Sequence, residues 1–177
     1  MIIDGGECDY GVESTIVKIE EDGSLLLLRP GAVTLEDLRA LDVPVSVAPA
    51  VLGELKAGEK VLSPGLKYRH YAPKAPLFLL DGSSINRKKF LAEEKNRIAY
   101  LAYEEELDSA FPENVSLYSI GPELDPLVQA KNLFRLLRLA DDENYDAIYA
   151  PLPKTDGMGM ALYNRMIRAA AHQIITL

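Results

Sequence analysis

The sequence has no tryptophan, a single cysteine and only two histidines among its 177 residues. With Cys8 alone there is no internal disulfide bond, and His70 and His172 lie far apart in the sequence, which argues against a structural zinc site. We expect Cys8 to be a buried structural thiol.

Long apolar stretches are missing as well, because no segment reaches the roughly 18 consecutive apolar residues of a membrane span. Residues 1–6 lack the basic start and the long apolar core of a secretory signal. We therefore expect a cytoplasmic protein without a membrane segment. What remains, with 48% hydrophobic and 26% charged residues, is typical of a soluble globular protein that buries a core of its own.

Positive charge is scarce, since the formal net charge is −8. This balance argues against nonspecific nucleic-acid binding by the chain as a whole, because phosphate contacts need clustered lysine and arginine. Residues 48–76 differ from the rest, with five basic and two acidic side chains. This middle segment is the only one with a net positive charge.

The start of the chain has the pattern of short strands. Residues 1–6 are typical of the end of a strand that enters a glycine turn. Residues 14–19 are rich in β-branched and apolar side chains, residues 25–28 are apolar, and the two runs flank Asp22-Gly23, a pattern that predicts a hairpin.

A short helix is expected after the hairpin. Thr34 precedes Glu36 and Asp37 as an N-cap precedes an acidic first turn, and the helix should end near Leu41. A hairpin and one short helix bury too little apolar surface to be stable alone. We therefore expect residues 1–47 to pack on another part of the protein.

Beyond this unit the pattern changes twice. Residues 48–76 show no helical or strand periodicity and are punctuated by proline and glycine, so we interpret them as a linker with a functional loop inside it. Residues 77–177 then alternate between strand and helix patterns, which predicts a parallel, doubly wound sheet of about four or five strands. The predicted strands are residues 77–80, 97–102, 115–118 and 147–150, and the predicted helices are residues 84–94, residues 125–140 and a last one from Gly157.

Two positions near the start of the chain are candidates for ligand contact. Ser14 and Thr15 follow a glycine turn and open a strand, where their hydroxyls either face a cleft or only decorate the strand. Arg29 lies between four leucines and Pro30-Gly31, so its planar guanidinium is aimed by a rigid strand and a tight turn. Such a group suits phosphate or carboxylate, and a surface salt bridge is the alternative.

The linker loop gathers positive charge beside aromatic rings. Lys67, Arg69 and His70 lie next to Tyr68 and Tyr71, a combination that offers phosphate contacts and a surface for a base. The alternative is a solvated loop with extended basic side chains. We favour the functional interpretation, because long loops in compact proteins usually carry function.

The last helix presents a basic face. Arg165, Arg168 and His172 recur at helical spacing, and the alternatives are a solvated face and a contact with tRNA or another domain. Residues 157–159, a Gly-Met-Gly start after Asp156, are weakly indicative of an anion near free backbone amides.

Several of these stretches resemble a known family. Residues 3–6 (IDGG), Cys8, residues 11–17 (GVESTIV) and residues 28–34 (LRPGAVT) resemble, in order and spacing, the closing portion of a YrdC domain. Residues 63–73 (SPGLKYRHYAP) resemble the interdomain loop of the two-domain, YrdC-type threonylcarbamoyl-AMP synthases.

The rest of the chain resembles the small C-terminal domain of the same enzymes. The residues that carry this part of the resemblance are Ala130, Leu133, Phe134, Leu137, Arg138, Gly159, Ala161, Asn164, Arg165, Arg168, Ala169 and Ala170. The resemblance implies an α/β chain in three parts. Residues 1–47 would be the C-terminal remnant of an α+β YrdC-type domain, residues 48–76 the interdomain linker, and residues 77–177 a Rossmann-like domain with a parallel sheet.

The resemblance also implies an activity. Enzymes of this family are nucleotidyltransferases that join L-threonine, bicarbonate and ATP, with Mg²⁺ accompanying the nucleotide, into threonylcarbamoyl-AMP and pyrophosphate for the threonylcarbamoyladenosine modification of tRNA. Carried over by motif, Ser14 would contact threonine and Arg29 the nucleotide. In the loop, the nucleotide-binding side chains would be Tyr68 and Arg69, and those that close it over the cleft would be Lys67, His70 and Tyr71. No residue is assigned as a metal ligand or as a covalent catalyst.

The preceding part of a YrdC domain, with its basic substrate-binding residues and its Ser-Ala-Asn segment, has no counterpart in this sequence. We therefore expect this chain alone to be inactive and to need the missing N-terminal portion, with proteins of the tRNA-modification machinery as further partners. The alternative is a noncatalytic module of the same descent that binds a nucleotide, tRNA or a partner protein.

Overall fold

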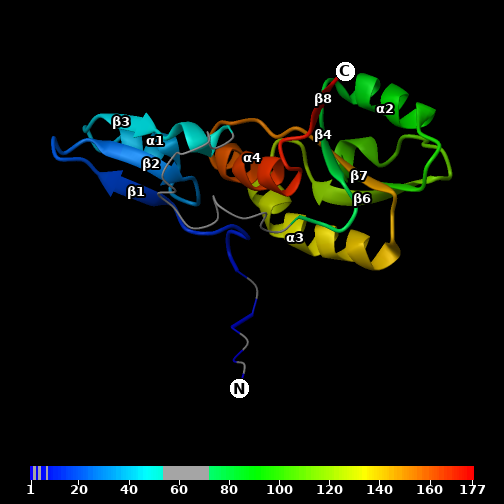
Figure 1. Cartoon of the computed structure of the whole chain (residues 1–177), viewed down its shortest axis with the longest axis horizontal. Coiled ribbons are helices and arrows are strands. Elements are labelled where there is room, and N and C mark those ends of the chain that lie inside the picture. The colour runs from blue at the N-terminus through cyan, green and yellow to red at the C-terminus, as the bar shows by residue number, and fades with distance from the viewer. Residues whose placement is uncertain (2, 4, 7, 54–71) are drawn as a thin grey trace.

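The computed structural model describes residues 1, 3, 5, 6, 8–53 and 72–177. These residues form a three-stranded sheet near the N-terminus and a five-stranded sheet in the remainder, with helix α4 (Met158–Ala169) lying between the two sheets (Figure 1). The α/β class expected from the sequence is confirmed. Within the described ranges no helix is both long and apolar enough to cross a membrane.

The small sheet contains the predicted hairpin. Strands β1 (Ile16–Ile19) and β2 (Leu25–Arg29) pair antiparallel, and β3 (Val45–Val47) then pairs parallel to β2. Helix α1 (Leu35–Arg39) connects β2 to β3 and buries its leucines against this sheet. Strand β3 was not predicted, because three residues are too few for an alternating pattern.

The large sheet has strand order β6-β5-β7-β4-β8, and all its neighbours pair parallel. Its strands are β4 (Leu77–Asp81), β5 (Ile98–Tyr103), β6 (Val115–Gly121), β7 (Ala147–Pro151) and β8 (Ile174–Thr176). The helices between them are α2 (Ser84–Glu93), α3 (Pro126–Glu143) and α4, and short 3₁₀ turns lie at Pro49–Val51 and Glu104–Glu106. The prediction of a parallel sheet is confirmed, with β8 as the strand that was missed.

Two apolar clusters cover the faces of the large sheet. Helices α3 and α4 bury Leu133 and Leu162 against Leu79 on one face, and α2 buries Leu91 against Leu80 on the other. All residues of the central strands β5 and β7 are buried, as expected for parallel strands covered on both faces. Met160 of α4 belongs instead to the core of the small sheet, so α4 contributes to both cores.

Two expectations about the ends of elements are wrong. Met1, Ile3, Gly5 and Gly6 lie outside any strand, because a strand forms only where a neighbour supplies hydrogen bonds. The last helix ends at Ala169, and His172 lies beyond it with a left-handed φ of 60°. His172 therefore does not share a helical face with the arginines of α4.

Candidate functional site

Two of the residues singled out in the sequence meet at the end of the hairpin. Arg29 is the last residue of β2, and the antiparallel register places it opposite Ile16, close to Ser14. The Arg29 Nε donates a hydrogen bond to the Ser14 carbonyl oxygen at 2.8 Å, and its Nη2 donates to the Ser14 hydroxyl at 3.1 Å. The predicted threonine-contact residue and the predicted nucleotide-contact residue thus contact each other.

The hydrogen bonds of Arg29 do not neutralise its positive charge. Both of its acceptors belong to Ser14 and are neutral, and among the described residues Arg29 forms no ion pair with a carboxylate. The surface salt bridge that the sequence left open is therefore not what this part of the structure shows. A half-buried guanidinium whose position is set by neutral acceptors is suited to bind an anionic ligand.

The neighbouring hydroxyl has a structural role instead. The Thr15 Oγ1 donates to the Val33 carbonyl oxygen at 2.7 Å and accepts from the Val33 amide at 3.1 Å. Gly31 packs so closely on this segment that a Cβ there would lie 2.5 Å from the Glu13 carbonyl oxygen. Thr15 and Gly31 thereby hold the backbone on which the exposed Ser14 is presented.

The turn before Ser14 is docked on the helices of the large sheet. Gly11, with a left-handed φ of 65°, packs against the backbone of Lys131 in α3 with no room for a side chain. Val12 packs on the core of the large sheet, and the Glu13 Oε2 lies 2.7 Å from the Arg165 Nε of α4 in an ion pair. The segment that carries Ser14 is therefore positioned by the C-terminal part of the chain.

Helix α4 also holds the start of the linker. The Asn164 Nδ2 donates to the Val51 carbonyl oxygen at 2.6 Å, and the Arg168 Nη2 donates to the Ala50 carbonyl oxygen. Arg165 is only 4% exposed, so the prediction of a solvated basic face is wrong for it. The arginines of α4 contact Glu13 and the Ala50 carbonyl oxygen, which precede the large sheet in the sequence. Burial is the main cause that lowers the pKa of Arg168, and the neighbouring positive charge of Arg165 lowers it further.

Sequence reasoning missed the partners of this helix. Glu13 and Asn164 lie inside stretches that carry the family resemblance, yet neither received a role. A lone glutamate and a basic helix more than a hundred residues later do not reveal by themselves that they meet. The only available signal was an acidic side chain in a glycine-flanked turn that needed a partner.

Cys8 contradicts its prediction, because the thiol is exposed rather than buried. Backbone hydrogen bonds from Tyr10 and Gly11 lower the pKa of this thiol. The physical reason is that the described residues before Gly11 extend away from both sheets, as Figure 1 shows.

The five loop residues Lys67, Tyr68, Arg69, His70 and Tyr71 lie outside the described residues. Their predicted roles in nucleotide binding and loop closure stay predictions. On either side of residues 54–71 the chain is attached to the helices of the large sheet. Val51 accepts from α4 on one side, and on the other the Lys74 amide donates to the Asp141 carboxylate at 2.6 Å.

Comparison with known proteins agrees with this architecture. Residues 33–171 match the model of the family described as threonylcarbamoyl-AMP synthase, C-terminal domain. The chain belongs to this family.

Relatives of this threonylcarbamoyl-AMP synthase family extend the similarity to the N-terminal segment. The chain is 34% identical to the threonylcarbamoyl-AMP synthase of Pyrococcus abyssi and 33% identical to that of Bacillus subtilis, in each case over 98% of its length. A crystal structure of P. abyssi Sua5 complexed with L-threonine superposes with a TM-score of 0.81 at 30% identity. The chain covers 50% and 49% of these two relatives and 50% of the chain in the crystal structure, so it spans about half the length of the relatives it matches.

Proposed function

We propose that this chain is the C-terminal part of an enzyme that forms threonylcarbamoyl-AMP and pyrophosphate from L-threonine, bicarbonate and ATP, for threonylcarbamoyladenosine modification of tRNA in the cytoplasm. The observation that carries the proposal is the pair formed by Ser14 and Arg29, which joins a hydroxyl to an anion-binding guanidinium at one point. The family membership and a relative solved with bound L-threonine support it.

The chemistry of adenylyl transfer explains why such a pair is useful. Threonine and bicarbonate combine with loss of water to a carbamate, whose oxygen attacks the α-phosphate of ATP as pyrophosphate leaves. Charge on the phosphate oxygens must therefore be stabilised while the reactants are held in line. In this proposal Arg29 binds the nucleotide phosphates and Ser14 orients threonine. No covalent intermediate with the protein is needed.

Magnesium would enter the site bound to the phosphates of ATP rather than to a protein cage. Within residues 8–53 and 72–177 no three His, Cys, Asp or Glu side chains are grouped so that they could hold a metal ion. We therefore assign no metal ligand in this chain and derive no step through the ion.

The chain alone is proposed to be inactive, because the groups that surround the substrates on the other sides would come from the half of the relatives that it does not match. A pyrophosphate-release assay with ATP, L-threonine and bicarbonate tests this. We expect turnover from a protein that joins this chain to a YrdC-type N-terminal portion and none from the chain alone. Equal turnover by both would support a complete site in the chain, and no turnover by either would favour the noncatalytic module.

Arg29 is tested in the joined protein. We expect Arg29→Ala to weaken ATP binding about tenfold or more, because a charge-assisted hydrogen bond to phosphate is lost. Arg29→Lys should restore part of the affinity but not the bidentate geometry. Arg39→Ala, on the exposed end of α1, is the matched control and should bind ATP normally. Unchanged ATP affinity in Arg29→Ala would remove the nucleotide assignment.

Ser14 is tested separately through the other substrate. We expect Ser14→Ala to raise the KM for L-threonine with little change in the affinity for ATP. The measurement is steady-state turnover at varied threonine, and Ser24→Ala, in the β1–β2 turn, serves as the control. A raised KM for ATP alone would place Ser14 on the nucleotide instead.

A further inference from the structure

A cavity lies at one edge of the large sheet and shares no lining residue with the Ser14–Arg29 pair. Its volume is about 450 Å³, and it opens beyond the carboxyl ends of strands β4, β5, β6 and β7. Clefts at this edge of a parallel sheet are where ligands of open α/β proteins bind. None of the residues that line it has a role in the proposed threonylcarbamoyl-AMP synthesis.

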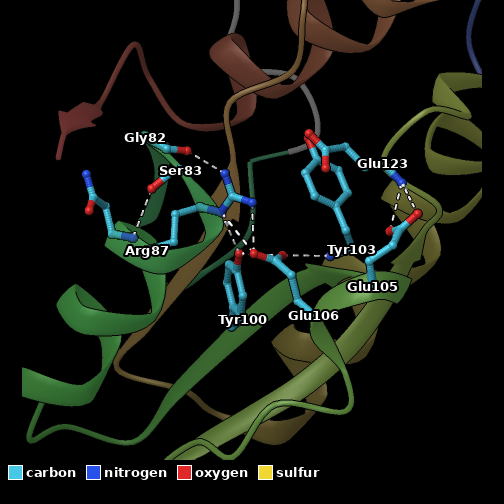
Figure 2. Close-up of polar contacts among 9 residues, drawn as sticks. Gly82, Ser83, Arg87, Tyr100, Tyr103, Glu105, Glu106 and Glu123 are labelled. Atoms are coloured by element: carbon cyan, nitrogen blue, oxygen red, sulfur yellow. Dashed lines mark hydrogen bonds and ion pairs between the residues drawn. The ribbon is translucent and has the colours of Figure 1, made fainter.

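The cavity rests on a buried ion pair, drawn in Figure 2. The Arg87 guanidinium donates from Nε and Nη2 to the Glu106 Oε1 at 3.2 and 2.8 Å, and from Nη1 to the Gly82 carbonyl oxygen at 2.6 Å. The Tyr100 hydroxyl donates to the Glu106 Oε2 at 2.8 Å. Buried charges are costly to keep away from water, and a fully bonded network of this kind makes the surface above it rigid.

Hydrogen bonds also fix the turn between β6 and α3, which forms one wall of the cavity. The Glu123 amide donates to both carboxylate oxygens of Glu105 at 3.0 and 3.2 Å (Figure 2). The Gln129 Nε2 donates to the carbonyl oxygens of Pro122 and Glu123 at 2.5 and 3.1 Å. The turn from β6 to α3 is thus shaped before any ligand arrives, and preorganisation of this kind lowers the entropic cost of binding.

The rim of the cavity, in contrast, carries charged side chains that bond to no other described residue. The carboxylates of Asp81, Glu123 and Asp156 and the ammonium of Lys154 line the cavity and are exposed. None of these four side chains has a hydrogen bond or an ion pair to another described residue. Three carboxylates against one ammonium make a rim that accepts hydrogen bonds and favours a ligand rich in hydroxyl or amino donors.

Between the rim and the buried ion pair, apolar side chains form part of the lining. These include Leu124, which is 82% exposed, and the half-buried Leu152. Tyr103 also lines the cavity, but it is only 7% exposed and the Arg87 guanidinium lies over its ring, 5.4 Å from the ring centre. Burial, more than any nearby charge, raises the pKa of the Tyr103 hydroxyl to about 12, so the ring stays neutral at physiological pH. A flat ring system can lie against Leu124 and Leu152 while its polar substituents reach the rim.

Phosphate is a poor match for this cavity, although the sequence indicated an anion at residues 157–159. The Gly159 amide at the start of α4 already donates to the Asp156 carbonyl oxygen at 2.8 Å, and the Met160 amide donates to the Gly157 carbonyl oxygen at 3.3 Å. The three rim carboxylates also repel a phosphate dianion. A ligand without phosphate is favoured.

We propose that this cavity is a second ligand site, which binds a nucleoside by packing its base on Leu124 and Leu152 and by receiving its ribose hydroxyls on the carboxylates of Asp81 and Glu123. Acidic side chains at the carboxyl edge of parallel sheets bind ribose hydroxyls in this manner. The site is independent of the proposed enzymatic function, because it uses residues 77–177 alone.

Adenosine and AMP are the matched probes, since they differ only in the phosphate. We expect calorimetric titration of the chain to show adenosine binding and to show AMP binding about tenfold more weakly, as one repelled charge pair at this range is worth about 1 kcal/mol or more. Amide resonances of Gly82 and Glu123 should shift with adenosine in an NMR titration. Absence of adenosine binding, or equal affinity for AMP, would overturn the proposal.

Variants locate the site. The double variant Asp81→Asn, Glu123→Gln should weaken adenosine binding about tenfold or more, because neutral amides replace charged acceptors on the exposed rim without disturbing the core. Glu93→Gln, an exposed carboxylate on α2, and Arg29→Ala should bind adenosine as the unaltered chain does. Loss of binding in Arg29→Ala with retention in the double variant would assign adenosine to the hairpin site and refute the cavity.

Discussion

Two ion pairs in this protein differ in what they contribute, although their lengths are similar. The Arg87–Glu106 pair is 2.8 Å long with side chains 7% and 8% exposed, and the Lys18–Glu20 pair is 2.6 Å long with side chains 50% and 33% exposed. Water screens the second pair but not the first. Burial lowers the pKa of Arg87, but the combined effect of Tyr100 and Glu106 outweighs it and raises that pKa.

Removing one partner of the buried pair should therefore be costly. We expect Arg87→Met to lower the free energy of unfolding by about 3–5 kcal/mol, because the Glu106 carboxylate remains buried without its countercharge. Lys18→Met, the matched change in the exposed pair, should cost less than about 1 kcal/mol. Urea unfolding followed by circular dichroism measures both. Similar losses in the two variants would show that Glu106 is relieved by protonation or by water.

At the scale of single elements, α1 shows how a very short helix is stabilised. Five residues are too few for a helix to form from intrinsic preference. The Thr34 hydroxyl accepts from the Asp37 amide at 3.2 Å, and the Asp37 carboxylate accepts from the Thr34 amide at 2.9 Å and from its hydroxyl at 2.8 Å. These bonds, together with the buried leucines, define where α1 begins.

Thr34→Ala should lower the free energy of unfolding by about 1 kcal/mol, since it removes the cap. Thr155→Ala, at an exposed residue outside any helix, should change it by less than about 0.5 kcal/mol. Hydrogen bonds from Thr34 lower the pKa of Asp37. The contribution of Asp37 is therefore present above the ordinary aspartate pKa and is lost as the pH falls, so the difference between the unaltered chain and Thr34→Ala should shrink below about pH 4.

At the scale of the whole molecule, the notable feature is that the two sheets share helix α4. Its Met160 packs in the core of the small sheet, its Leu162 packs in the core of the large one, and Arg165 pairs with Glu13. The position of the Ser14 segment thus depends on residues about 150 places later in the sequence.

Breaking that connection should loosen the first sheet selectively. We expect Arg165→Met to raise the hydrogen-exchange rates of the amides of residues 12–15 by about tenfold or more, while those of β5 remain protected. Arg135→Met, at an exposed position on α3, is the control and should leave both sets unchanged. Uniform acceleration across both sheets would indicate global destabilisation instead of local undocking.

The buried tyrosines give the fold a predictable alkaline limit. Burial is the main cause that raises the pKa of Tyr100 well above its usual range and that of Tyr103 to about 12. Above about pH 10 the unfolded chain loses these protons while the folded chain keeps them, so stability is complete below that pH and falls as the pH rises. Between pH 9 and 11 we expect a loss of about 1.4 kcal/mol for each of the two groups.

Urea unfolding at the two pH values measures that loss, and Tyr103→Phe should reduce it by the share of one tyrosine. A free energy of unfolding that did not change between pH 9 and 11 would contradict the burial of these hydroxyls.

Much of the large sheet could be predicted from the sequence. Strands such as β5 and β7 are continuous apolar runs, and Asp125-Pro126 marks the start of α3, because these signals are local and repeat at a fixed spacing. Strand β8 was missed, since its three residues gain their conformation only by pairing with β4. Ser14 and Arg29 were identified from local patterns and the family resemblance, but their contact depends on the register of the hairpin.

The sequence by itself determined the alternation of strands and helices, the capped start of α1 and the hydroxyl and guanidinium of the hairpin, because backbone preferences and apolar spacing act over a few residues. Only the tertiary structure decided that Arg165 would be buried against Glu13 and that Cys8 would be exposed. It also brought the ends of four strands together around one cavity. Burial and charge pairing depend on contacts between residues that are far apart in the sequence, and a local sequence pattern does not specify those contacts.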